Sequence, residues 1–346
     1  MKKLIIFLVV IWCFAMPVSA AEVTAPEVPD SGRELMPDKP ETFAEGVLEI
    51  LREAITVIRP DLAEAAATCT GVAAAVLLAS MLRSFPGITQ KTIELAGTVC
   101  VASILMLGTN SLIALGAETV TELSSYGKLL LPVMTAALAS QGGITASASL
   151  YTATAAFNAL LTALISDVLI PLIYVFLALS AANSAIGEEA LKKAGDLVKW
   201  VMSWSLKTIL YIFTGYMGIT GIVSGTTDAA TLKATKLTIS GMVPVVGGIL
   251  SDASEAVLVG AGTVKNAAGI YGILAVFAIC VVPFLKIGIH YLLLKATSGV
   301  CGVFGCKRIT DLIADFSGAM GMLLAMTGSE SLLILISTVC FLKGVG

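Results

Sequence analysis

Long apolar segments separated by short polar stretches occupy most of the chain after residue 60. A transmembrane helix needs about 20 predominantly apolar residues, and several of these segments reach that length. The pattern therefore predicts an all-α, polytopic membrane helical bundle. The apolar segments lie at 62–82, 93–115, 129–139, 144–165, 168–186, 206–224, 242–250, 256–262, 269–294 and 318–342.

Two of these segments, 129–139 and 242–250, are too short to cross a bilayer. Each contains a proline near its start, Pro132 or Pro244, and each stops at polar or small residues. Irregular backbone at membrane depth is tolerated only where protein buries it or where it lines a cavity. We therefore predict that both segments form short half-helices or re-entrant hairpins.

The two short segments belong to a predicted internal repeat. One constant offset along the chain pairs Pro132 with Pro244, Pro171 with Pro283, and Gly187 with Gly299. A slightly larger offset pairs Lys192, Lys193 and Asp196 with Lys307, Arg308 and Asp311. The predicted organisation is a leading two-span unit at 61–127, a first membrane repeat at 128–226, and a linker with a second repeat at 227–346. Repeats with broken helices are common in transporters, but this likeness does not establish transport.

Before the membrane region the sequence predicts a signal peptide, a tether and one amphipathic helix. Residues 1–20 join two lysines to a short apolar run and a small-residue site at Ala20, which is typical of a cleavable secretory signal. An uncleaved anchor is the alternative. Residues 21–41, rich in Pro, Glu and Asp, predict a flexible acidic tether. A capping-box pattern and a stop at Pro60 predict an extracytoplasmic helix over 42–60.

The apolar face of the 42–60 helix carries Phe43, Val47, Leu51 and Ile55 at helical spacing. Its polar face is mostly acidic, whereas helices that lie on a membrane surface favour Lys and Arg. We therefore predict that these four side chains dock on protein, which is either the membrane domain of the same chain or a partner.

The composition agrees with a membrane protein and excludes several functions. Hydrophobic residues make up 57% of the 346 residues and charged residues only 13%, which is too little polar surface for a soluble protein. The net charge of −3 indicates no nucleic-acid partner. Seven cysteines and one histidine, without metal-ligand spacing, indicate no metal site. Because no nucleotide-binding or hydrolase motif is present, we predict no cofactor and no enzymatic activity.

Lys286 and His290 lie one helical turn apart within the 269–294 segment. Ionisable residues inside a span are candidates for an ion or proton path, so both residues are candidates for one. The alternative, which the sequence favours, is that both lie near a membrane face and extend their polar ends to water.

The distribution of basic residues predicts the orientation of the connecting segments. Arg83 and Lys91 follow the first span, which places that connector in the cytoplasm under the positive-inside rule. The connectors 188–199 and 299–315 are equivalent in the predicted repeat and both are basic. We therefore expect both of them on the cytoplasmic side.

The chain resembles the stage III sporulation protein AE family of endospore-forming bacteria. The resemblance covers nearly the whole chain and is most specific over 192–272. Its clearest motifs are Gly215-Tyr-Met-Gly-Ile-Thr-Gly, Gly225-Thr-Thr-Asp, Lys233-Ala-Thr-Lys and Val243-Pro-Val-Val-Gly-Gly-Ile-Leu-Ser-Asp-Ala-Ser-Glu. The family carries no catalytic motif, so the resemblance transfers no functional residue.

The resemblance implies a location in the mother-cell membrane around the forespore. It implies one subunit of a trans-envelope channel or feeding complex, with the other stage III A proteins and the stage II Q protein as partners. That complex supports late forespore gene expression under sigma G, and a YidC-type insertase is the expected insertion partner. The alternative function is a self-sufficient secondary transporter or permease of a small solute.

Overall fold

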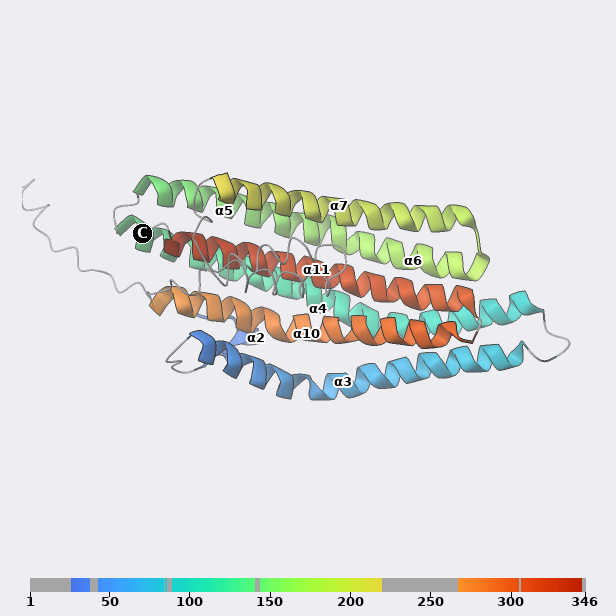
Figure 1. The fold of residues 1–346 in the computed structure, drawn as a ribbon. Coiled ribbons are helices and arrows are strands. Elements are labelled where there is room, and N and C mark those ends of the chain that lie inside the picture. Colours follow the sequence, from blue (N-terminus) through green and yellow to red (C-terminus); the bar gives the residue numbers. More distant parts are fainter. Residues whose placement is uncertain are drawn as a thin grey trace, which may run out of the picture.

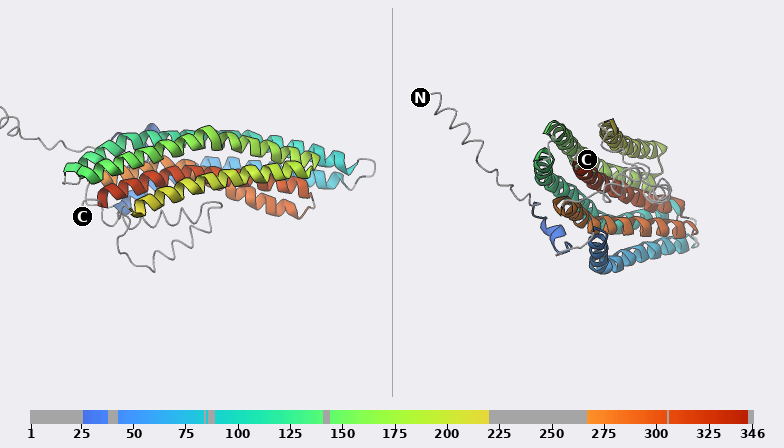
Figure 2. Two further views of the ribbon diagram at one scale, coloured as in Figure 1. Left: turned by 90° about the horizontal axis from the view of Figure 1, so that it is seen from above. Right: turned by 60° about the vertical axis from the view of Figure 1, so that its left-hand side comes forward.

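Long helices lying side by side form an elongated bundle in the computed structural model (Figure 1), and the further views in Figure 2 show the same elongated shape. The structure describes residues 26–37, 43–83, 85, 89–140, 144–219, 267–304 and 306–343. No strand occurs in these ranges, so the all-α prediction is confirmed. The helices are α2 Asp30–Arg33, α3 Phe43–Leu82, α4 Gln90–Ser140, α5 Ile144–Ala163, the π-helix η1 Leu164–Leu169, α6 Ile170–Ile186, α7 Glu189–Ile219, α10 Ala267–Gly302 and α11 Lys307–Lys343.

Successive long helices run in opposite directions along the bundle (Figure 1). The helices α3, α10 and the continuous rod of α5, η1 and α6 run one way, while α4, α7 and α11 return. The connections from α3 to α4, from α6 to α7 and from α10 to α11 therefore share one end. We call this the hairpin end and define it by the described residues 83, 85, 89, 187, 188, 303, 304 and 306.

The helix α11 is the centre of the bundle. It packs against α10 and α4 over most of its length and also contacts α5, α6 and α7. The most apolar stretch of α11 is entirely buried within the protein, whereas α3 leaves most of its apolar stretch exposed. The apolar character of α11 is therefore used for packing in the core, and that of α3 faces the surroundings of the bundle.

Five helical segments in the described part of the chain are long and apolar enough to cross a membrane, which indicates a multi-pass membrane protein. The helix α4 alone has 51 residues and is about 75 Å long, against roughly 30 Å for the hydrocarbon layer. Parts of the bundle therefore extend beyond the hydrocarbon. The five segments are Phe43–Leu82, Gln90–Ala139, Ser147–Ile186, Gly269–Gly302 and Lys307–Leu342.

The helix end predicted at Pro60 is wrong, because α3 continues through this residue to Leu82. A proline inside a helix removes one hydrogen bond and costs about 3 kcal/mol or more. Packing compensates here, since Ala54 and Ile58 before the proline and Ala65 after it are all buried. Pro60 itself is exposed, and α3 is bent along its length (Figure 1).

The short helix predicted at 129–139 is also wrong, because this segment is the last part of α4. Pro132 is exposed on the outer face of α4, while Leu130, Met134 and Leu138 are buried on its inner face. The inner contacts keep the helix intact. The domain boundaries expected at 60/61 and 127/128 thus fall inside continuous helices, and the second short segment, 242–250, lies outside the described residues.

Part of the predicted flexible tether is folded. Within 26–37, α2 packs against α10, and Val28 and Leu35 are buried. Ser31 Oγ also donates a hydrogen bond of 2.6 Å to Glu122 Oε2 on α4. The tether was predicted from the acidic composition of 21–41. Composition does not show that the apolar side chains of this segment pack against α10, which is distant in sequence. The predicted signal peptide, 1–20, lies outside the described residues.

The π-helix η1 joins α5 to α6 without breaking the rod. At its end the Ile170 N–H donates to the Ile165 carbonyl, five residues back instead of four. Pro171 follows and has no N–H to offer. The wider turn before Pro171 therefore accommodates the proline ring, and the segments 144–165 and 168–186 form one continuous path.

The internal repeat stays a prediction. Its two predicted units have the same helix order and direction: α7 turns back antiparallel to the rod that ends in α6, and α11 turns back antiparallel to α10 (Figure 1). The connectors 188–199 and 299–315 begin at the same end of the bundle, where the Gly187 backbone lies against Arg308. The glycines differ, because Gly187 ends α6 with a φ of 81° while Gly299 lies inside α10.

Candidate functional site

Lys286, predicted as a candidate for an ion path, forms an ion pair. Its Nζ lies 3.1 Å from Asp61 Oδ2, and this contact joins α10 to α3. His290 Nδ1 lies 2.9 Å from the Lys286 carbonyl oxygen, one turn back on the same helix. Both side chains are half-buried. The ion pair gives Lys286 a structural partner, and a role in ion movement stays a prediction.

Three of the four docking candidates on α3 pack within the chain. Phe43, Val47 and Leu51 are half-buried against a small cluster that α10 completes, with Leu274 among its buried members. Ile55 remains 57% exposed. Of the two occupants predicted for this face, the membrane domain of the same chain therefore takes the first three positions, and Ile55 stays available.

A fully buried carboxylate, which the sequence analysis overlooked, lies in α11. Glu330 has no exposed surface, and its Oε1 accepts a hydrogen bond of 3.1 Å from Thr162 Oγ1 on α5. Its Oε2 has no hydrogen-bond partner within the part of the chain that the structure describes. Ionisable residues inside spans are rare and usually functional, so Glu330 is the strongest single candidate of the bundle.

A chain of polar contacts leads from this carboxylate through α5 to α4. The same Thr162 hydroxyl lies 2.7 Å from the Asn158 carbonyl oxygen, so its one proton is shared between this oxygen and Glu330 Oε1. Asn158 Nδ2 lies 3.3 Å from both the carbonyl and the hydroxyl oxygen of Ser124. Asn158 Oδ1 and the hydroxyl of the buried Tyr126 lack partners among the described residues. We call Ser124, Asn158, Thr162 and Glu330, which these contacts link, the core polar cluster.

The core polar cluster borders the irregular part of the α5–α6 rod. Thr162 lies two residues before η1 begins at Leu164. Short π-helical stretches inside α-helices often occur at functional sites, because the extra residue in the turn loosens the regular hydrogen-bond ladder. Ser166 Oγ in η1 is another buried polar atom without a partner in the described ranges. The cluster therefore places a buried carboxylate beside an irregular turn of the rod.

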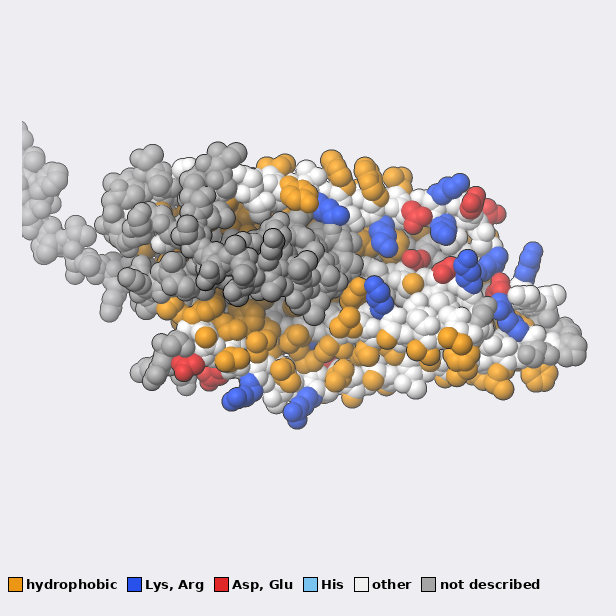
Figure 3. Space-filling view, in the orientation of Figure 1, with side chains coloured by type: hydrophobic (Ala, Val, Ile, Leu, Met, Phe, Trp, Pro, Cys, Tyr) orange, Lys and Arg blue, Asp and Glu red, His pale blue; other side chains and the backbone are white. Residues whose placement is uncertain are grey.

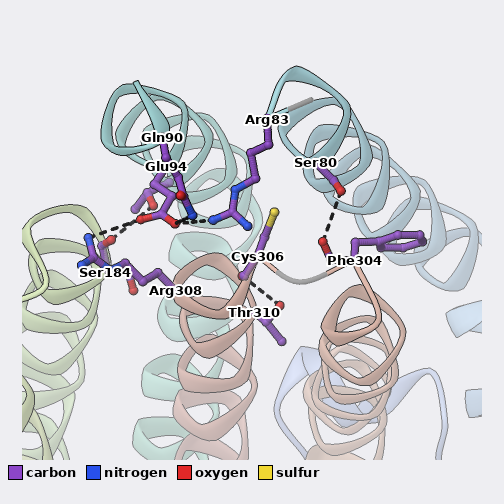
Figure 4. A network of polar contacts seen from close by, with 10 residues as sticks. Ser80, Arg83, Gln90, Glu94, Ser184, Phe304, Cys306, Arg308 and Thr310 are labelled. Carbon is purple, nitrogen blue, oxygen red and sulfur yellow. Dashed lines mark hydrogen bonds and ion pairs between the residues drawn. The ribbon is translucent and has the colours of Figure 1, made fainter. Parts of the chain in front are cut away.

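A second polar network ties the helices together at the hairpin end (Figure 4). Glu94 on α4 forms ion pairs with Arg83, just after α3, and with Arg308 on α11, the latter at 3.5 Å. Gln90 Nε2 donates to Glu94 Oε1 at 3.4 Å. We call these four residues the Glu94 clasp. It joins three helices through one carboxylate whose side chain is largely buried.

A polar hollow of about 290 Å³ lies between α6, α7 and α11 near the same end. Figure 3 shows charged side chains of both signs gathered on this part of the surface. Ser180 Oγ donates to Asp315 Oδ2 at 2.5 Å inside the hollow. The residues paired by the predicted repeat meet here, because the lining includes Lys192, Asp196, Lys307 and Asp311.

The match to known families covers all of the long helices. The family model described as stage III sporulation protein AE matches residues 42–344. The chain belongs to the stage III sporulation protein AE family. The core polar cluster and the Glu94 clasp both lie within the match. In the described ranges no group of three or more His, Cys, Asp or Glu side chains is placed to hold a metal ion.

A curated relative supports the family membership confirmed above. The chain is similar to stage III sporulation protein AE of Bacillus subtilis (strain 168), with 23% identity over 252 residues. The alignment covers 72% of this chain and 63% of the relative, which is less than two thirds of its length. No solved structure matches the chain.

Proposed function

We propose that this chain is a non-enzymatic, multi-pass membrane subunit of a sporulation complex that spans the envelope between mother cell and forespore. The complex acts as a channel or feeding apparatus and is needed for late forespore gene expression under sigma G. The observation that carries the proposal is the family match over 42–344, which includes every long helix of the bundle. The location that follows is the mother-cell membrane around the forespore, with the N-terminal segment extracytoplasmic.

The proposed partners are the other stage III A proteins and the stage II Q protein, with a YidC-type insertase for membrane insertion. The outer side of α3 offers a surface for such a partner. Leu48, Ile55 and Leu62 are 65%, 57% and 46% exposed, and their spacing of seven residues places them on one side of the helix. We call them the α3 stripe.

The charges around the α3 stripe favour a protein partner over lipid. Glu49 and Arg52 are exposed on the same turns of α3, and charged groups are costly in contact with hydrocarbon. An apolar stripe bordered by charged residues has the composition of a protein–protein contact with a polar rim. The inner side of the helix is already used by its contact with α10.

The substitution Ile55→Arg tests the proposal in sporulating cells. We expect the variant protein to accumulate normally, because Ile55 is exposed, but to lose co-purification with the other stage III A proteins and expression of a sigma G reporter. Val57→Arg is the matched control, because Val57 is also exposed but faces a different side of α3. Wild-type co-purification and reporter expression in the Ile55 variant would contradict the role of the stripe.

A self-sufficient permease is the second candidate, favoured by the buried carboxylate of Glu330 beside the irregular η1. Transporters commonly place such groups at broken helices near the membrane centre. Liposomes that contain the purified full-length chain alone separate the two functions. Solute uptake by these liposomes that Glu330→Gln abolishes and Ile55→Arg leaves unchanged would favour the permease.

A further inference from the structure

The carboxyl group of Glu330 lies where a bare negative charge is strongly disfavoured. It has no exposed surface, and it forms no ion pair with any side chain that the structure describes. An isolated carboxylate moved from water into a low-dielectric interior costs many kcal/mol, and such a group is stable only when it is neutralised or paired. One hydrogen bond from Thr162 is too little compensation for a full charge.

The groups facing Glu330 come from four helices. On α4, Lys128 is exposed yet close enough to act on the charge of Glu330. On α10, Cys280 lies beside Ser331, the residue after Glu330. On α5, the contact is made by the Thr162 hydroxyl, which also lies against the Asn158 carbonyl.

The helix α7 contributes apolar groups near this level. Leu206 on α7 lines a small hollow with Met326, which is one turn before Glu330 on α11. The next residue, Lys207, is half-buried and is the charged side chain of α7 nearest in sequence to that contact. Within the described part of the bundle, Lys128 is thus the cation whose charge acts on Glu330.

We propose that Glu330 is a reversible proton-binding site. In the described arrangement the carboxyl group holds the proton on Oε2, while Oε1 accepts the hydrogen bond from Thr162. On release the O–H bond breaks, its electron pair stays on the carboxylate, and the proton passes to water. The carboxylate is then stabilised by the charge of Lys128 on α4. The ligand of this site is a proton, and a sodium ion is the competing outcome.

Infrared spectroscopy of the purified full-length protein in lipid vesicles tests the site. We expect an absorption band of a protonated carboxyl group at neutral pH that disappears in Glu330→Gln and persists in Glu118→Gln, an exposed carboxylate of α4. The band should vanish as pH rises at constant sodium concentration. A band that Glu330→Gln leaves unchanged would overturn the proposal, and so would a band that responds to sodium but not to pH.

The same variant tests whether the proton must leave during function. Glu330→Gln keeps the size and neutrality of the protonated side chain, so the protein should accumulate and co-purify with its partners. We expect spore formation by this variant to fall to the level of a strain that lacks the protein. Spore formation at the wild-type level would contradict the claim that Glu330 must release its proton during function. Because Ile55→Arg fails at co-purification instead, failure of this proposal is distinguishable from failure of the complex.

A second variant covers the case in which Glu330→Gln does not fold. Thr162→Val removes the hydrogen bond to Oε1 and leaves the carboxyl group in place. We expect the pH at which the carboxyl band disappears to change in Thr162→Val. An unchanged pH for the disappearance of the band would contradict the assignment of the band to this cluster.

Discussion

Replacing Glu94 with Gln should destabilise the bundle, because one carboxylate serves two arginines. The side chains of Arg83 and Glu94 are 20% and 15% exposed, so their ion pair is largely shielded from water. The side chain of Arg308 is 41% exposed. In Glu94→Gln the amide cannot compensate the positive charge of either guanidinium, and the two guanidinium groups remain close to each other.

The expected cost is about 3 kcal/mol. Breaking a buried ion pair by removing one partner costs about 3–5 kcal/mol, and the Arg83 pair belongs at the lower end because it is not completely buried. The Arg308 pair adds less than about 1 kcal/mol, since water screens its exposed guanidinium. At roughly 2 °C per kcal/mol for a large chain, the midpoint of thermal unfolding should fall by about 6 °C.

The assay is thermal unfolding of the detergent-purified protein at one fixed heating rate. Glu189→Gln is the control, because the Glu189–Lys193 pair at 3.5 Å is exposed on both sides and should change the midpoint very little. The double variant Arg83→Met with Glu94→Gln should cost less than the sum of the two single changes. Strictly additive costs would refute the ion pair as the cause.

Two further substitutions test other contacts of the bundle. Gly187→Ala should lower the midpoint of thermal unfolding, because a φ of 81° costs a non-glycine residue about 1–2 kcal/mol. The new Cβ would also lie 2.6 Å from Arg308 Nη2. Gly299→Ala is the control and should leave the midpoint unchanged, because the space around Gly299 in α10 is open. Exchanging Lys286 and Asp61 should preserve sporulation if their ion pair is structural, whereas sporulation lost in the exchanged protein would favour the ion-path role of Lys286.

The apolar pattern predicted the helices well and their ends poorly. Helices satisfy their backbone hydrogen bonds internally, so a long apolar segment in a membrane protein predicts a helix. The prolines misled the prediction because their cost is local and the contacts that outweigh it are not. Ala54, Ile58 and Ala65 bury the inner side of α3 on both sides of Pro60, and no property of residues 42–60 shows that α10 lies beside them.

The two polar sites differ in what the sequence could have revealed. Glu330 is the only carboxylate in the apolar segment 318–342, so the rule that selected Lys286 also applied to it. It was overlooked because the flanking Ser329 and Ser331 gave it no motif. The Glu94 clasp was beyond sequence reasoning, since Arg308 and Glu94 are distant in the chain and meet only after α4 and α11 pack.

The arrangement of the helices adds α7 to the five described segments that are long and apolar enough to cross a membrane. The helix α6 ends at the hairpin end, while α10 starts at the opposite end, so the chain must return between them (Figure 1). The helix α7 makes this return along α6, and its 31 residues are about 46 Å long, enough to cross the hydrocarbon. The charged residues lower the mean hydropathy of α7, and they lie in its first two thirds, towards the hairpin end: Lys192, Lys193, Asp196, Lys199 and Lys207. Those charges gather where the basic connectors already lie, so α7 completes an antiparallel bundle in which the three turns of the hairpin end lie together, as the positive-inside rule predicts for one side of the membrane.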